Sequence, residues 1–209
     1  MLLSGGLDSA TNLYLAKKLR FKCFCLTFDY GQRHKRELAS ARKIARRAGC
    51  PIKILKIHLP WKGSSLLDKA LSIPSRLTSA VPSTYVPARN IIFLSFALSY
   101  AEAIKAEAIF IGVHAEDYSG YPDCRPEFYR AFNRAAERGI KAGKKIKILT
   151  LLIHKNKAQI IRLAAKLGVP LALTSSCYAG GNSPCGECDS CRYRAKGFKE
   201  AGIKDPICP

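Results

Sequence analysis

Short apolar runs alternate along the chain with stretches in which apolar residues recur at helical spacing. The apolar runs predict strands at residues 1–3, 21–28, 52–57, 108–113 and 146–152. The helical spacing predicts helices at residues 7–19, 35–48, 90–104, 127–140 and 157–167. This alternation is typical of an α/β fold, so we expect a parallel five-stranded sheet with helices on both faces.

Residues 58–88 break this periodicity, because prolines and serines accumulate there. A loop of this length in a compact domain is usually functional or disordered. We therefore expect a long loop between the third strand and the third helix.

The turn Ser4-Gly5-Gly6-Leu7-Asp8-Ser9 joins the first predicted strand to the first predicted helix. Two glycines let a backbone approach an anion closely, and N–H groups at a helix start donate to phosphate oxygens. The turn is not a Walker loop, because no Lys follows the second glycine. Asp8 is a candidate Mg²⁺ ligand. The alternative is an ordinary glycine turn with a polar cap. On the nucleotide interpretation, the residues expected to bind the nucleotide are Leu3, Ser4, Gly5, Gly6, Leu7, Asp8, Ser9 and Ala10.

The composition describes a folded, strongly basic chain. Of its 209 residues, 48% are hydrophobic, and 35 Lys and Arg against 15 Asp and Glu give a net charge of +20. Such a field attracts the phosphates of a nucleotide or a nucleic acid, or it is simply a solvated surface. We expect no membrane span, because no window approaches about 18 apolar residues. We also expect no signal peptide, and hence a cytoplasmic protein whose nine cysteines are reduced, metal-bound or catalytic.

Four of these cysteines, Cys177, Cys185, Cys188 and Cys191, lie close together near the C-terminus. Closely spaced thiols on a glycine-containing turn suit a tetrahedral Zn²⁺ site, and four thiolates leave no open position, so the metal is expected to be structural. An iron–sulfur cluster, a disulfide pair and reactive thiols are the alternatives. We predict a nucleotide-binding α/β domain at residues 1–170 and a zinc-binding segment packed on it at residues 171–209.

Several motifs in order along the chain resemble one family. They are SGGLDS (4–9), YGQRHKREL (30–38), VPARN (86–90), GYPDCRPEF (120–128), KAQIIRLAAKLGVP (157–170), SCYAGG (176–181) and CGECDSC (185–191). Together they resemble the 7-cyano-7-deazaguanine synthase (QueC) family of the PP-loop ATP pyrophosphatases. The resemblance covers nearly the whole chain.

The resemblance implies an activity. Members of this family convert 7-carboxy-7-deazaguanine, ammonia and ATP to the nitrile through an adenylated acid and an adenylated amide, in queuosine and archaeosine precursor biosynthesis. It also implies ATP with Mg²⁺ as cosubstrate, structural Zn²⁺ and a homodimer, with no membrane or required nucleic acid. Ammonia is expected to be free or separately supplied, because no glutaminase domain fits in the chain.

The resemblance further implies roles for particular residues. Asp8, Arg89 and Lys157 are the expected catalytic residues, because they can hold or neutralise charge on the phosphates. Asp117, Asp123 and Arg125 are candidate substrate contacts. The motif at residues 30–34 is expected to border the adenine or the ribose, with His34 either a base or a side chain that fixes the loop.

Two other classes of function remain open from the sequence. A PP-loop tRNA-modifying enzyme of the thiolase type is favoured by the charge, but it requires a catalytic cysteine pair, for which Cys23 and Cys25 in a predicted strand are poor candidates. A non-enzymatic zinc module that binds nucleic acid is disfavoured by the complete pyrophosphate loop.

Overall fold

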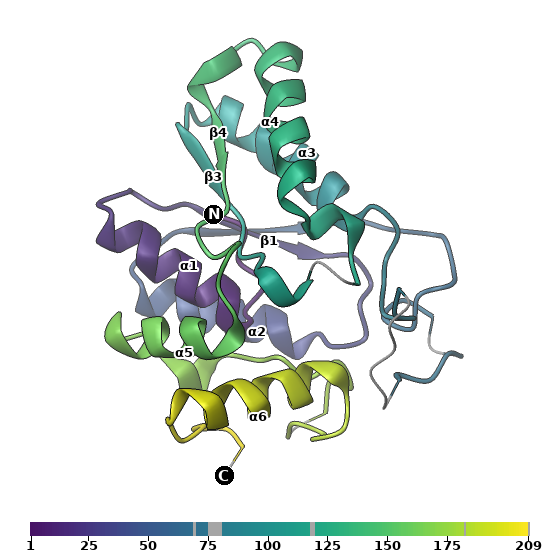
Figure 1. Ribbon diagram of the computed structural model, residues 1–209. Helices are drawn as coiled ribbons and strands as arrows, with labels where there is room; N and C mark the ends of the chain where they lie inside the picture. The colour runs from purple at the N-terminus through teal and green to yellow at the C-terminus, as the bar shows by residue number, and fades with distance from the viewer. Residues whose placement is uncertain (69, 75–80, 118–119, 182, 209) are drawn as a thin grey trace.

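The computed structural model describes residues 1–68, 70–74, 81–117, 120–181 and 183–208 (Figure 1). Its α-helices are α1 (Leu7–Lys18), α2 (Arg36–Arg47), α3 (Arg89–Ala103), α4 (Pro126–Gly139), α5 (Lys157–Lys166) and α6 (Asp189–Ala201). Its strands are β1 (Cys25–Asp29), β2 (Ile52–Lys56), β3 (Ala108–Phe110) and β4 (Lys147–Leu149). Short 3₁₀ turns occur at Ala115–Asp117, Pro122–Cys124, Gly143–Lys145 and Leu171–Leu173.

The strands form two parallel pairs, β1 with β2 and β3 with β4, on either side of the N-terminal segment Met1–Leu3. The backbone N–H of Leu3 donates to the carbonyl of Leu26 in β1, and that of Leu2 donates to the carbonyl of Phe110 in β3, both at 2.9 Å. This segment makes only an isolated bridge to β1, because it is too short for a ladder on both sides. The continuous five-stranded sheet that the sequence predicts is therefore not present among the described residues, although the fold is α/β with parallel strands.

A cavity of about 330 Å³ of solvent-accessible volume lies beside the amino end of this segment. Its walls come from residues 21–24 before β1, the end of α3 and residues 104–110. In Figure 1 the β3–β4 pair runs across the direction of β1 and lies to one side of the β1–β2 pair.

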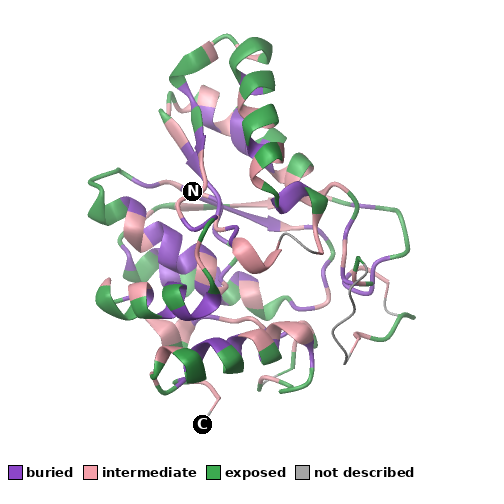
Figure 2. Cartoon of the chain, viewed as in Figure 1, coloured by how far each residue is buried: buried purple, intermediate pink, exposed green. Residues whose placement is uncertain are grey.

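Side-chain alternation along the strands builds two hydrophobic cores, one on each face. Leu3, Cys25 and Phe110 pack with α1, α2, α5 and α6, whereas Leu2, Leu26 and Ile109 pack with α3 and α4. Because successive strand residues point to opposite faces, both faces must be covered by helices. Figure 2 shows the consequence, with buried residues along β1 and exposed residues along the outer sides of the helices.

Each predicted helix is present and ends within two residues of its expected bounds. Helix α6 was not among the sequence predictions, although Asp189 in its first turn and Gly202 after its last residue, with φ of 70°, are ordinary helix-end signals. In the predicted loop at residues 58–88, the described part contains no helix or strand, and residues 69 and 75–80 lie outside the described residues.

Residues at the carboxyl ends of Met1–Leu3, β1 and β3 line one pocket, the position where ligands bind in parallel α/β folds. No helix in the described part of the chain is both long and apolar enough to cross a membrane.

Candidate functional site

The Ser4–Ser9 turn has the geometry of an anion cradle. Gly5 has φ of +90°, and a Cβ there would lie 2.2 Å from the Glu37 carbonyl oxygen in α2, so only glycine fits. The Ser4 and Ser9 hydroxyls are 3.0 Å apart. The first intrahelical bond of α1 runs from Ala10 N to the Gly6 carbonyl, so the N–H groups of residues 7–9 precede it at the positive end of the helix.

Asp8 in the first turn of α1 meets Lys157 from the first turn of α5. The Lys157 ammonium donates to both carboxylate oxygens of Asp8, at 2.8 and 2.9 Å. His114 Nε2, beyond the end of β3, lies 2.8 Å from Lys157 Nζ and 3.6 Å from both Asp8 Oδ2 and Asp117 Oδ2. We call Asp8, His114, Asp117 and Lys157 the Asp8 cluster.

Within the Asp8 cluster, neighbouring charges offset the effect of burial on the pKa values of Asp8 and His114. Burial alone would raise the pKa of Asp8, but the adjacent Lys157 and His114 hold that pKa well below its usual range. Burial would likewise lower the pKa of His114, yet Asp8 and Asp117 raise it overall. Burial raises the pKa of Asp117. The cluster thus presents an ionised carboxylate beside an ammonium group, a pairing suited to a divalent cation and to phosphate oxygens.

Close packing behind the cluster brings α1 to the end of β3. A Cβ at Gly112 would lie 2.9 Å from the backbone nitrogen of Ser9. Glycine at this position therefore permits the start of α1, and with it Asp8, to approach the chain that carries His114.

Arg89, at the first residue of α3, reaches Tyr30 at the end of β1. Its Nη1 donates to Tyr30 Oη at 3.1 Å. Burial raises the pKa of Tyr30 to about 12, so the phenol stays protonated beside the arginine. The preceding residue, Ala88, adopts the left-handed region with φ of 54°, and its N–H donates to Tyr85 Oη at 3.2 Å. This strained backbone, held by its surroundings, aims Arg89 toward the strand ends.

Two adjoining pockets meet at Asp8 and Asp117. The larger, with about 270 Å³ of solvent-accessible volume, runs from the Ser4–Ser9 turn past Arg89 and Tyr30. The smaller, about 140 Å³, is lined by Lys157 among others. The three expected catalytic residues therefore border one continuous region, although they lie far apart in the chain.

Of the three candidate substrate contacts, only Asp117 lies at the pockets. Asp117 borders both pockets. Asp123 is buried and accepts from the backbone N–H of Asn90 at 2.9 Å, so it caps the start of α3. Arg125 is exposed at the residue before α4 and lines neither pocket.

The motif at residues 30–37 forms a hydrogen-bonded loop. The fully buried Gln32 donates to Glu37 at 2.8 Å and accepts from the backbone of Tyr30. His34 Nε2 lies 3.1 Å from Glu37 Oε2. This geometry favours the loop-fixing role for His34, one of the two that the sequence left open.

Residues 175–180 connect the pockets to the four cysteines. The N–H of Ser175 donates to the Gly5 carbonyl at 2.9 Å, and Gly180 lies so close to His34 that a Cβ there would be 3.0 Å from its Cα. Tyr178, between these contacts, lines both pockets.

The sulfurs of Cys177, Cys185, Cys188 and Cys191 all lie within 4.8 Å of one another. The Sγ atoms of Cys185 and Cys191 are 4.0 Å apart, close to the ~3.8 Å separation expected for two thiolates on a tetrahedral ion with ~2.3 Å metal–sulfur bonds. Backbone N–H groups donate to Cys177 and Cys185 at 3.4 Å. Burial opposes ionisation of Cys185, but the backbone N–H groups of Cys188 and Glu187 donate to its sulfur and lower its pKa to about 7. The donor set fits a bound metal ion.

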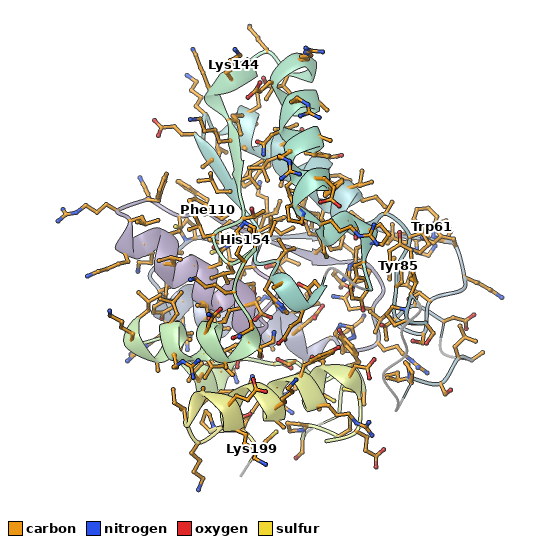
Figure 3. The ribbon with its side chains drawn as sticks, in the orientation of Figure 1. Trp61, Tyr85, Phe110, Lys144, His154 and Lys199 are labelled. Atoms are coloured by element: carbon orange, nitrogen blue, oxygen red, sulfur yellow. The ribbon has the colours of Figure 1, made fainter. Side chains whose placement is uncertain are left out.

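The remaining sequence candidates for chemistry lie elsewhere. Cys23 and Cys25 are buried, and burial raises the pKa of Cys25 to about 12, which disfavours the reactive thiolate that a thiolase pair needs. Figure 3 places Lys144 and Lys199 at opposite ends of the molecule, so the positive charge is not confined to one end.

Sequence reasoning missed His114 and Tyr178. The position of His114, immediately after a strand predicted to end at residue 113, was an available signal, since carboxyl ends of parallel strands gather at the ligand-binding edge. Tyr178 offered only its adjacency to Cys177.

Comparison with known proteins gives a consistent result. The family model described as queuosine biosynthesis protein QueC matches residues 1–202. A 7-cyano-7-deazaguanine synthase of Acetivibrio thermocellus is 53% identical over 99% of this chain and 95% of its own length. A 7-cyano-7-deazaguanine synthase of Nostoc punctiforme is 49% identical over 99% of this chain and 97% of its own length.

Two solved structures share the fold at low sequence identity. An NMN synthetase from Francisella tularensis aligns over 97% of this chain and 76% of its own, with a TM-score of 0.54 and 16% identity. The U34-tRNA thiolase NcsA from Methanococcus maripaludis aligns over 100% of this chain and 75% of its own, with a TM-score of 0.52 and 16% identity.

Proposed function

The chain belongs to the QueC family of queuosine biosynthesis proteins, and from this premise we propose that the two pockets at the strand ends are where it forms a nitrile. The chain is an ATP-dependent ligase of the 7-cyano-7-deazaguanine synthase kind, which joins ammonia to 7-carboxy-7-deazaguanine. The observation that carries the location is the meeting of Asp8 and Lys157, from the starts of α1 and α5, beside the Ser4–Ser9 turn.

ATP binding is proposed for the larger pocket. The N–H groups at the start of α1 and the hydroxyls of Ser4 and Ser9 suit the phosphates. The purine and ribose then lie toward Tyr30, along the same pocket. Asp8 is the proposed Mg²⁺ ligand, because its carboxylate is ionised and borders both pockets.

The smaller pocket suits the deazaguanine. Its lining includes Asp117, Tyr121 and Tyr178. A carboxylate accepts from the N–H groups of a guanine-like edge, and aromatic rings pack on its flat faces. Asp123 and Arg125, which line neither pocket, are not part of this proposal.

The reaction needs two activations, because a carboxylate has no good leaving group. In the first, a carboxylate oxygen attacks the α-phosphorus of ATP, releasing pyrophosphate, and ammonia then displaces AMP and loses a proton to give the amide. In the second, the amide oxygen attacks another ATP, releasing pyrophosphate. Departure of AMP and loss of the two N–H protons, counted from amide to product, leave the carbon–nitrogen triple bond.

Arg89 and Lys157 are proposed to stabilise charge in these steps. Each α-phosphorus attack concentrates negative charge on phosphate oxygens, and fixed positive groups in an enclosed site lower that barrier. Arg89 is held by Tyr30 and Lys157 by Asp8, so neither needs to reorganise far.

For the four cysteines we propose Zn²⁺. Sulfurs within 4.8 Å of one another can surround a single ion, and four thiolates would saturate it, so it would stabilise the fold and not react. The division at residue 170, the homodimer and the cytoplasmic location remain predictions.

An isotope experiment tests the proposal. Purified protein receives 7-carboxy-7-deazaguanine with ¹⁸O in both carboxylate oxygens, ammonia and Mg-ATP. We expect a nitrile product, and AMP carrying one ¹⁸O for each activation, because each substrate oxygen leaves on AMP.

Label in inorganic phosphate would contradict adenylation and indicate phosphorylation instead. Absence of the nitrile from folded, metal-loaded protein would contradict the proposed function itself.

A further inference from the structure

Helix α6 joins the four cysteines to the Asp8 cluster. It begins directly after Cys188 and carries Cys191 in its first turn. Ser190 and Tyr193, on the same helix, line the smaller pocket together with Lys157. The metal-binding segment therefore supplies a wall of the pocket.

Helices α5 and α6 pack closely together at Gly197. A Cβ built on this residue would lie 2.4 Å from Cγ of Lys157 and 2.9 Å from Cδ1 of Ile161. Gly197 lies inside a helix, where Ala is more favourable than glycine. A glycine at this position has a packing reason, which is to leave room for the stem of Lys157.

A buried ion pair holds α6 in this position. Arg194, about one turn before Gly197 on α6, donates to both carboxylate oxygens of Asp205 at 2.6 and 2.8 Å. It also donates to Thr174 Oγ1 at 2.8 Å. Arg162 of α5 donates to the Glu200 carbonyl of α6 at 2.9 Å. Because α6 is held at several points, a side chain at residue 197 would displace Lys157 more readily than the helix.

We infer that Gly197 is a positioning residue, which lets the Lys157 ammonium reach Asp8 and His114. The inference rests on the proposed role of Lys157 in the reaction. It makes the cysteine segment part of the catalytic apparatus, since the helix that the metal site anchors decides where a reacting-site cation lies.

The test is a double-mutant cycle. Gly197→Ala is made together with Ile161→Val, which removes the Cδ1 atom and leaves the Lys157 contact as the remaining clash. Ile161→Val alone is the matched control, and the same pair of variants is made with Lys157→Met. Turnover, KM for both substrates, thermal midpoint and bound metal are measured for each.

We expect Gly197→Ala to lower kcat about 10- to 100-fold in the Ile161→Val background, because a displacement of about 1 Å can cost 100-fold. KM for the deazaguanine and the metal content should stay unchanged. With Lys157→Met present, Gly197→Ala should cost less than about twofold, because the side chain it displaces is already inactive.

Equal losses in both backgrounds would overturn the inference and make Gly197 structural only, as would no loss in either. If Lys157→Met alone keeps the wild-type kcat, the proposed role of Lys157 fails, and the inference fails with it. If Lys157→Met is impaired while Gly197→Ala is not, only the inference fails.

Discussion

The four cysteines and the Asp8 cluster are assembled in different ways. The cysteines come from one stretch of chain between residues 177 and 191, whereas Asp8 and Lys157 are 149 residues apart and His114 comes from a third element. The first arrangement depends on local turns, and the second depends on the crossing of α1, β3 and α5. A local site is legible as a sequence motif, but an assembled site depends on the whole fold.

The two regions are nevertheless connected through residues 175–180 and α6. The N–H of Ser175 is bonded to Gly5, and Gly197 contacts Lys157. We therefore expect damage to the cysteine site to spread to the pockets, and damage to the pockets to stay local. The predictions below test this asymmetry.

The largest effect is expected for Cys191→Ser. A structural Zn²⁺ contributes an apparent ~10–16 kcal/mol in small zinc domains, and loss of one thiolate forfeits a large part of that. Bound metal, measured by elemental analysis, should fall from about one equivalent toward zero, with lower thermal stability and activity. The control is Cys208→Ser, in the same segment but outside the cysteine group. Full activity in metal-free Cys191→Ser would show that the two regions are independent.

Next comes Arg194→Met, which loosens α6, the helix that connects the two regions. Arg194 and Asp205 are both buried, so the variant leaves an unpaired buried carboxylate. We expect a loss of about 3–5 kcal/mol in the free energy of unfolding, measured in urea. Adding Asp205→Asn should recover part of the loss. A change below about 1 kcal/mol would mean that the pair does not hold α6.

Asp8→Asn tests the opposite direction. The amide keeps the shape of the side chain but loses the charge that Lys157 and Mg²⁺ would use. We expect kcat/KM to fall about 10²–10³-fold, equivalent to ~2.7–4 kcal/mol. The amount of metal bound at the four cysteines should stay unchanged. Asp68→Asn, outside both pockets, is the matched control. Loss of metal from the four cysteines in Asp8→Asn would contradict the expectation that damage to the pockets stays local.

The smallest effect is expected for Asn156→Ala. Asn156 caps α5, with its side chain accepting from Gln159 N at 2.8 Å, directly before Lys157. Removing the cap should cost about 1 kcal/mol of stability, and Asn156→Asp should restore most of it. A kcat loss greater than about tenfold would show that the cap also sets the position of Lys157.

The elements of the fold were largely predictable. Helical spacing located five of the helices, because apolar side chains on one face record which face is buried. The pairing of the strands was less so. Met1–Leu3 bonds to both strand pairs yet forms no continuous sheet with them, and such pairing depends on partners distant in the chain.

Within the candidate site, the sequence identified residues better than it identified their neighbours. Asp8, Arg89 and Lys157 were expected to act together, and the structure brings all three to the adjoining pockets. Asp123 carried the same kind of signal as Asp117, but it caps α3. The sequence does not distinguish a carboxylate that faces a ligand from one that caps a helix, because the tertiary surroundings decide between the two.

The amino-acid sequence by itself determined the Ser4–Ser9 turn and the cysteine group, because consecutive residues and tight turns bring their own atoms together. Only the tertiary structure decided that His114 lies against Lys157 and that Gly197 packs against the aliphatic part of the Lys157 side chain. Those contacts join separate elements, and their geometry follows from how the helices pack on the strands, which no single stretch of chain encodes.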